Sequence, residues 1–196
     1  MAEAVALDPG AYGGTYKLIG GAAALDFANL VSYRDTDREH DWLAPPSNLG
    51  LWVAAAGLDV GGPGSSGEVR EARELRELLA RVFLAVADGV APAAADLARI
   101  GSLADGRSGG RRLEWDADAA VARWVAPPPS LPVALGSDAA ALLTSAELLR
   151  RVTACDECRW VFLDSTRNRS RRWCDPADCG NRSRQRRHYQ RHRTAG

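Results

Sequence analysis

The four cysteines of this chain lie close together near its C-terminal end. They form two pairs, Cys155-x2-Cys158 and Cys174-x4-Cys179, with fifteen residues between the pairs. A short spacing lets one turn direct two thiolates at a single ion, and a second turn completes the tetrahedron. Four thiolates leave zinc no open coordination position, so such a site stabilises structure and catalyses nothing. The spacing therefore predicts one structural Zn²⁺ ion bound by all four cysteines.

Arginine is concentrated in the same part of the chain. The segment from Cys155 to Gly196 carries eleven arginines against five acidic residues, a formal charge of +6, and the residues before it carry −6. A basic end on an acidic body is a common layout in proteins that bind nucleic acid. The candidate contacts are Arg167, Arg169, Arg171 and Arg172 between the cysteine pairs, and Asn181, Arg182, Arg184, Arg186, Arg187 and Arg191 after them.

The residues after the last cysteine predict a basic helix. Asn181 is a favourable N-cap for a helix from Arg182 to about Arg193. The arginines surround this helix, and Tyr189 is its one large apolar residue, so we expect no face that docks on the body. Arginines four positions apart repel each other, so the helix should fray until a polyanion binds.

Other interpretations of this segment remain open. The positive charge could belong to a solvated tail, or the zinc-stapled module could dock a protein partner instead of nucleic acid. Trp160, Phe162 and Trp173 flank the cysteines and could form a small core or a platform for stacked bases. The residues alone do not choose between DNA and RNA.

The C-terminal segment resembles the CGNR zinc finger. The resemblance rests on residues 155–164, on Arg172-Trp173-Cys174 and on Cys179-Gly180-Asn181-Arg182, the tetrapeptide that names the family. A second resemblance involves Leu25-Asp26-Phe27-Ala28-Asn29, which is similar to the opening motif of the ABATE domain. These resemblances imply a stress-induced transcriptional regulator with a zinc-dependent end that binds nucleic acid, and they favour DNA over RNA.

Asp26 and Asn29 are the candidate ligand-binding residues of the body. Residues 22–32 have apolar side chains at helical spacing, and these two polar residues stand three positions apart on one helical face. With a nearby aromatic side chain such as Trp52 they could line a pocket for a small polar effector. The same groups could instead make internal hydrogen bonds, and both interpretations stay open.

The predicted helices and strands indicate an α+β protein. It has a mainly helical body with a small antiparallel hairpin, followed by a zinc-finger or ribbon-like module. We expect a loose leader over residues 1–14, an ABATE-like domain over 15–152 and the finger with its basic helix over 153–196. Ser47 is a predicted N-cap, and Ser65-x-x-Glu68 is a predicted capping box before a long apolar stripe. Alternation over 113–125 predicts the hairpin, and a last helix should run from about Leu131 to Val152.

Catalysis and membrane insertion find no support in the sequence. His40 is the one histidine before the finger, and there is no Walker-type loop and no G-x-S-x-G motif. No stretch approaches ~18 apolar residues, and the N-terminus lacks the basic start of a secretory signal. Cysteines in metal spacing fit a reducing compartment. We therefore expect a cytoplasmic protein that is not an enzyme, and whose body senses a ligand or forms a homodimer.

Overall fold

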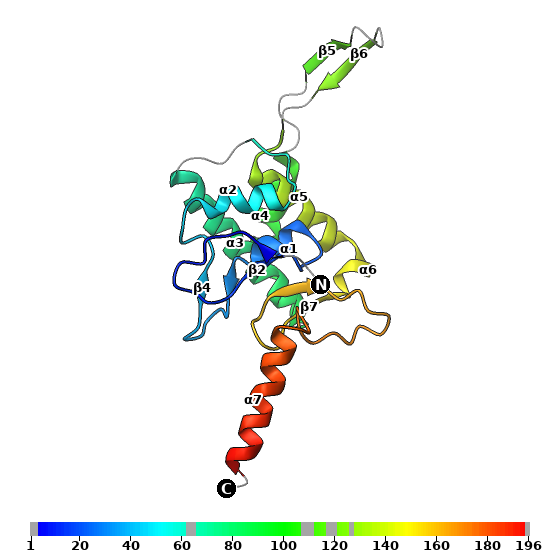
Figure 1. The fold of residues 1–196 in the computed structure, drawn as a ribbon. Coiled ribbons are helices and arrows are strands. Elements are labelled where there is room, and N and C mark those ends of the chain that lie inside the picture. Colours follow the sequence, from blue (N-terminus) through cyan, green and yellow to red (C-terminus); the bar gives the residue numbers. More distant parts are fainter. Residues whose placement is uncertain (1–3, 62–65, 107–111, 117–120, 126–127, 195–196) are drawn as a thin grey trace.

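The computed structural model describes residues 4–61, 66–106, 112–116, 121–125 and 128–194 (Figure 1). Its longest helix is α3 (Ser66–Ala87), whose apolar stripe includes the buried residues Leu75, Leu79 and Phe83. Such a stripe must be covered by other elements. The remaining helices are α1 (Ala23–Ala28), α2 (Asn48–Ala55), α4 (Ala94–Asp105), α5 (Leu131–Thr144), α6 (Ala146–Leu149) and α7 (Cys179–Thr194). The α3 helix packs against α1, α4 and α5.

The strands are short and pair as antiparallel neighbours along the chain. The described residues form four pairs: β1 (Ala4–Val5) with β2 (Tyr16–Lys17), β3 (Val31–Ser32) with β4 (His40–Asp41), β5 (Arg112–Asp116) with β6 (Val121–Val125), and β7 (Val152–Ala154) with β8 (Val161–Leu163). The predicted hairpin over residues 113–125 is confirmed by the pairing of Leu113 with Trp124. Figure 1 shows this hairpin at the end of the molecule opposite α7.

The prediction of one helix from Leu131 to Val152 is wrong beyond Thr144. Ser145 adopts an extended backbone, with φ −98° and ψ 103°, and its hydroxyl accepts a hydrogen bond from the Leu148 amide. This serine therefore ends α5 and caps the short α6. Val152 then enters β7, where it pairs with Leu163.

Ser47 stands at the N-cap position of α2, as predicted, but it has helical angles, φ −60° and ψ −27°, and its side chain makes no capping bond. The other predicted N-cap, Asn181, is wrong. Asn181 lies inside α7, which already begins at Cys179. The earlier start follows from the backbone, because the Arg182 amide donates to the Asp178 carbonyl at 3.0 Å and so makes the first helical hydrogen bond. Ser65 of the predicted capping box lies outside the described residues.

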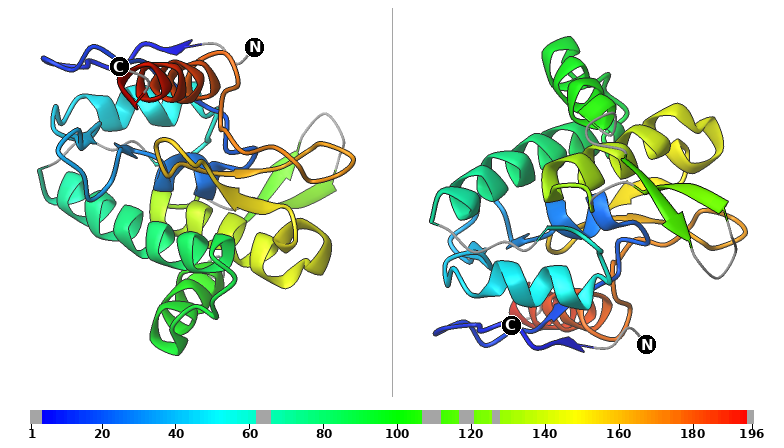
Figure 2. Two further views of the ribbon diagram at one scale, coloured as in Figure 1. Left: turned by 90° about the horizontal axis from the view of Figure 1, so that it is seen from below. Right: turned by 90° about the horizontal axis from the view of Figure 1, so that it is seen from above.

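The hydrophobic core continues from the body into the C-terminal module. Tyr16, Phe27 and Trp52 from the body belong to the same buried cluster as Trp160 and Phe162 near the cysteines. Strands β7 and β8 contact α3, and β8 also contacts α1. The α7 helix leaves the body on the side of the N-terminal segment rather than on the side of α3 and α5 (Figure 2). In the described part of the chain, no helix is both long and apolar enough to cross a membrane.

Candidate zinc centre and nucleic-acid interface

Two backbone turns carry the four cysteines. The first connects β7 to β8 and is closed at 2.8 Å by the Cys155 amide, which donates to the Trp160 carbonyl. Arg159 in this turn has a left-handed backbone, with φ 63°. The second turn precedes α7, and there the Ala177 amide donates to a carboxylate oxygen of Asp175 at 2.9 Å. Each turn thus places two thiols on the same side of the chain.

The cysteine sulfur atoms form a cluster of the size that zinc requires. All four lie within 4.8 Å of one another, and all four residues are buried. The Sγ atoms of Cys158 and Cys174 are 3.5 Å apart, and those of Cys174 and Cys179 are 3.6 Å apart. A tetrahedron with Zn–S bonds of about 2.3 Å has edges of about 3.8 Å. The four cysteines therefore fit one structural zinc ion, which links the two turns.

Asp164 organises the loop between the cysteine pairs. Its carboxylate accepts hydrogen bonds from the amide and hydroxyl of Thr166 and from the amide of Arg171, at 2.7–2.8 Å. Burial acts to raise the pKa of Asp164, but these hydrogen bonds together outweigh burial and hold the pKa below its usual range.

The arginines between the cysteine pairs divide into two kinds. Arg171 donates from Nε to the Trp173 carbonyl at 2.9 Å, and its guanidinium lies 4.5 Å from the centre of the Phe162 ring. Arg172 forms an ion pair of 2.6 Å with Asp156. Arg167 and Arg169 are exposed on the loop. Arg171 therefore supports the fold of the finger, whereas the other loop arginines remain the predicted contacts.

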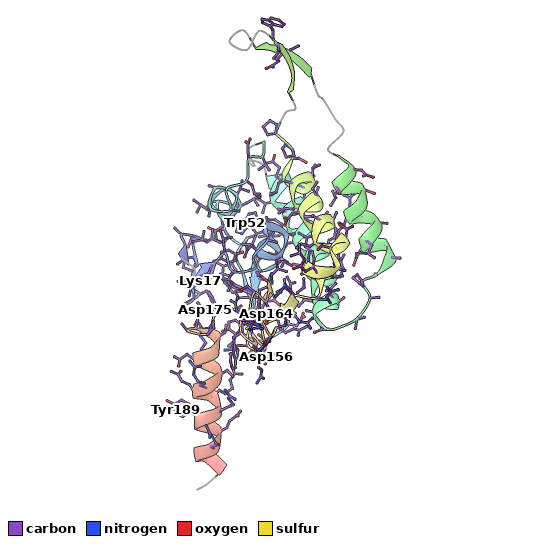
Figure 3. All side chains as sticks on the ribbon, turned by 90° about the vertical axis from the view of Figure 1, so that its right-hand side faces the viewer. Lys17, Trp52, Asp156, Asp164, Asp175 and Tyr189 are labelled. Atoms are coloured by element: carbon purple, nitrogen blue, oxygen red, sulfur yellow. The ribbon has the colours of Figure 1, made fainter. Side chains whose placement is uncertain are left out.

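The α7 helix holds the other predicted contacts. Asn181, Arg184, Arg186, Arg187 and Arg191 are exposed along it, and Arg182 is half-buried at its base. In Figure 3 the side chains radiate from this helix, and Tyr189 lies well away from the body. The structure thus brings these residues together on one projecting element, as the sequence predicts.

Hydrogen bonds from α1 and β3 fix the zinc module to the body. The side-chain amide of Asn29 donates to the Val161 carbonyl at 2.9 Å and accepts from the Val161 amide at 2.8 Å. The indole nitrogen of Trp160 donates to the Val31 carbonyl at 3.0 Å. Both contacts are buried. The module is therefore packed against the body and is not a separately tethered appendage.

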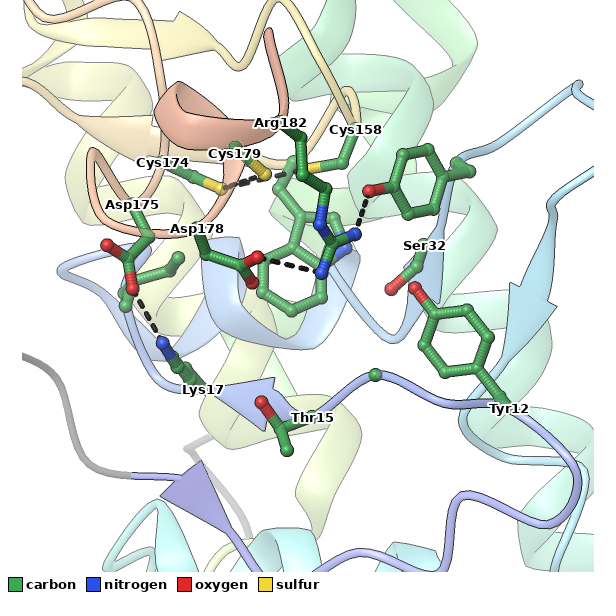
Figure 4. Close-up of a pocket in the computed structure, with 14 residues that line it drawn as sticks. Tyr12, Thr15, Lys17, Ser32, Cys158, Cys174, Asp175, Asp178, Cys179 and Arg182 are labelled. Atoms are coloured by element: carbon green, nitrogen blue, oxygen red, sulfur yellow. Dashed lines mark hydrogen bonds and ion pairs between the residues drawn. The ribbon is translucent and has the colours of Figure 1, made fainter. Parts of the chain in front are cut away.

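A polar pocket lies at this junction (Figure 4). Its charged groups are already paired: Lys17 with Asp175 at 2.6 Å, and Arg182 with Asp178 at 2.7 Å. The space left inside it is about 20 Å³, room for a single water molecule. The pocket is thus part of the contact between the N-terminal segment and the zinc module, and its charged side chains neutralise one another.

The predicted effector residues serve internal contacts. Asp26 accepts a hydrogen bond from the Gly20 amide at 2.7 Å, and Trp52 donates to the Tyr16 hydroxyl at 3.1 Å. The side-chain amide of Asn29 is hydrogen-bonded to the backbone of Val161. None of the three lines the pocket at the junction. The effector pocket therefore stays a prediction, and the alternative of internal hydrogen bonding agrees with these contacts.

Asp26 should make stability depend on pH. Burial raises its pKa from 3.8 to about 6, against the hydrogen bonds from the backbone of Gly20 and Ile19. The folded state binds the proton more tightly than the unfolded state, so this group favours folding at low pH. That contribution, on the order of 3 kcal/mol, is lost as the pH rises from about 4 to above 6.

Thermal unfolding of the zinc-loaded protein and of Asp26→Asn checks this expectation. The amide is uncharged at every pH, so the Tm of Asp26→Asn relative to the unmodified protein should rise between pH 5 and pH 7. Comparing the two proteins cancels the pH dependence of zinc binding, which both share. A Tm difference that stays constant over this range would contradict the assignment.

Two family models match the sequence. Residues 21–146 match the ABATE model, described as "Putative stress-induced transcription regulator". Residues 151–192 match the CGNR zinc finger model. The search of curated proteins found no match. The boundary between the two matched segments falls beside α6 and β7.

Proposed function

The chain belongs to the ABATE family and ends in a CGNR zinc finger, and from this premise we propose that it is a zinc-dependent regulator that binds DNA. It acts by binding and not as an enzyme. The zinc ion holds the base of α7, the arginines bind phosphate, and the body supplies the regulatory input as an effector site or a homodimer. Sedimentation with and without duplex DNA distinguishes a monomer from a dimer.

The observation that carries this proposal is the position of α7. The helix is 16 residues long, which corresponds to about 24 Å. It projects from the zinc centre away from the body (Figure 1), and no acidic residue occurs within it. A projecting basic helix of this length matches the major groove of B-DNA, which is about 12 Å wide and admits an α-helix.

The aromatic residues beside the cysteines favour duplex DNA over single strands. Proteins that bind single strands stack bases on exposed aromatic rings. Trp160 and Phe162 are 7% and 0% exposed, so neither offers such a platform. Arg172 lies over the half-buried Trp173, at 5.4 Å from the ring centre. Duplex RNA is disfavoured as well, because its major groove is too narrow for side chains to read.

Fluorescence anisotropy tests the proposal. The zinc-loaded protein is titrated against a 20-base-pair DNA duplex (about two helical turns), single-stranded DNA and duplex RNA at several salt concentrations. Five phosphate contacts would give a slope of log affinity on log salt of about −4.5. We expect this slope with duplex DNA and weaker binding to the other two.

The control is Cys174→Ser, which removes one zinc ligand and leaves every arginine in place. It should lose tight binding, because α7 then has no fixed base. Weak binding of the zinc-loaded protein with a flat salt response would refute the proposal. It would favour a module that docks a protein partner.

A further inference from the structure

The arginines of α7 form two rows that have different surroundings. Arg182 and Arg186 stand four positions apart, so they lie on one face of the helix. Arg184, Arg187 and Arg191 follow a spacing of three and four and lie on another face. We call the first set the inner row and the second the outer row. The sequence alone indicates arginines all around the helix.

The first residue of the inner row is held by the body. Arg182 donates to the hydroxyl of Tyr33 and pairs with Asp178 at 2.7 Å (Figure 4). Tyr33 is buried, and its amide donates to the Cys158 carbonyl at 3.3 Å. It also has a left-handed backbone, with φ 54°, which is unusual for a bulky residue and typical of functional positions. Tyr33 therefore joins the body, the zinc centre and α7.

The second residue of the inner row is held one turn further along. Arg186 forms an ion pair with Glu157, whose side chain is 2% exposed. Arg38 of the body reaches the same carboxylate at 3.4 Å. A buried carboxylate needs its cationic partners, so this contact fixes Arg186 in place. Two anchored turns on one side set the rotation of the helix about its own axis.

The outer row faces solvent. Within the described part of the chain, Arg184 and Arg187 have no acidic partner, and both are exposed. Arg191 is exposed too, and its Nε donates to the Arg187 carbonyl at 3.3 Å. The charges of Arg184 and Arg187 are therefore available to neutralise an external polyanion, whereas the charges of the inner row are already neutralised.

We infer that the outer row contacts the phosphates of duplex DNA and that Tyr33 and Glu157 act as positioning residues, which turn this row toward the DNA by holding the inner row. The inference rests on the proposed function and adds to it a division of labour among the arginines. It makes the body part of the DNA-binding apparatus, because Tyr33 belongs to the body and holds Arg182 of α7.

Adjacent residues supply a matched test. Arg186→Gln and Arg187→Gln remove the same charge at neighbouring positions, and glutamine preserves helix propensity. Binding of each full-length, zinc-loaded variant to the duplex is measured from 50 to 300 mM salt (roughly one third to twice the physiological ionic strength). Arg187→Gln should reduce the magnitude of the slope of log affinity on log salt by about 1. It should also weaken binding about eightfold at 0.1 M salt. Arg186→Gln should leave the slope unchanged.

Tyr33→Phe tests the positioning role, because it removes only the hydroxyl that holds Arg182. It should weaken binding by the same factor at every salt concentration, with the slope of the unmodified protein. Zinc content and helicity measured by circular dichroism confirm that each variant is folded. Arg182→Gln and Arg184→Gln provide a second matched pair if Arg186→Gln does not fold.

Three results would overturn the inference. The first is an equal reduction in the slope of log affinity on log salt for Arg186→Gln and Arg187→Gln. The second is an unchanged slope for Arg187→Gln. The third is a reduced slope for Tyr33→Phe. Each of these requires that the unmodified protein binds DNA, so they are distinct from a failure of the proposed function, which would appear as no binding by the unmodified protein even at 50 mM salt (below physiological ionic strength).

Discussion

Removing the zinc ion should destabilise the whole chain and not only its C-terminal module. Structural zinc sites contribute apparent binding energies of about 10–16 kcal/mol to folding. The cysteines share one buried cluster with residues of α1 and α3, so loss of the module uncovers apolar surface of the body. We expect Cys174→Ser to cost at least about 5 kcal/mol, which corresponds to a fall in Tm of roughly 10–20 °C for a chain of this size.

Thermal unfolding followed by far-ultraviolet circular dichroism and by tryptophan fluorescence measures this effect. Trp42 and Trp52 report on the body, and Trp160 and Trp173 report on the module. Both signals should shift together when a chelator is added. Ser165→Ala, in the exposed loop between the cysteine pairs, is the control and should leave Tm unchanged. A body transition that stays at its original temperature after the module has unfolded would contradict this expectation.

Asn29→Ala should be among the most destabilising single substitutions outside the zinc site. The side chain is 2% exposed and satisfies both the amide and the carbonyl of Val161. Alanine would leave two buried backbone groups without partners, each at a cost of about 1–3 kcal/mol. We therefore expect a loss of about 3–5 kcal/mol in the free energy of unfolding, together with weaker retention of zinc.

Urea unfolding of the zinc-loaded protein gives the free energy, and Asn181→Ala supplies the matched control. That substitution removes an exposed asparagine of α7 and should change stability by less than about 0.5 kcal/mol. Equal effects at the two positions would show that the contact between Asn29 and Val161 does not hold the module on the body.

The features that the sequence predicts well are those encoded within a short stretch. The two cysteine pairs need only local turns, and the hairpin of β5 and β6 follows from alternation over a few residues. The apolar stripe of α3 is likewise visible in a window of two or three turns. In each case, neighbouring residues contain the physical information.

The predictions that failed involve competition between local signals. Asn181 is a favourable N-cap in isolation, but the backbone makes its first helical bond at Asp178, so α7 starts at Cys179, three residues before the predicted start at Arg182. Ser145 lies within an apolar pattern that predicts one continuous helix. Its hydroxyl instead caps a new helix, so the predicted helix is interrupted at this residue. The division of the arginines into two rows depends on partners far away in sequence, such as Tyr33 for Arg182. No window of local sequence contains that pairing.

The packing of the N-terminal segment against the zinc module has a consequence for the timing of folding. Tyr33 contacts Arg182, and Lys17 contacts Asp175. In each pair the second residue is synthesised some 150 residues after the first. At synthesis rates of about 5–20 residues per second, the early segment spends roughly 8–30 seconds without its partners. Its hydrophobic groups, Tyr16 and Phe27 among them, are exposed to chaperones and to aggregation during that interval. Capture of the metal then becomes the event that completes the fold, so a cell short of zinc should accumulate this protein as a chaperone client rather than as an inactive native form.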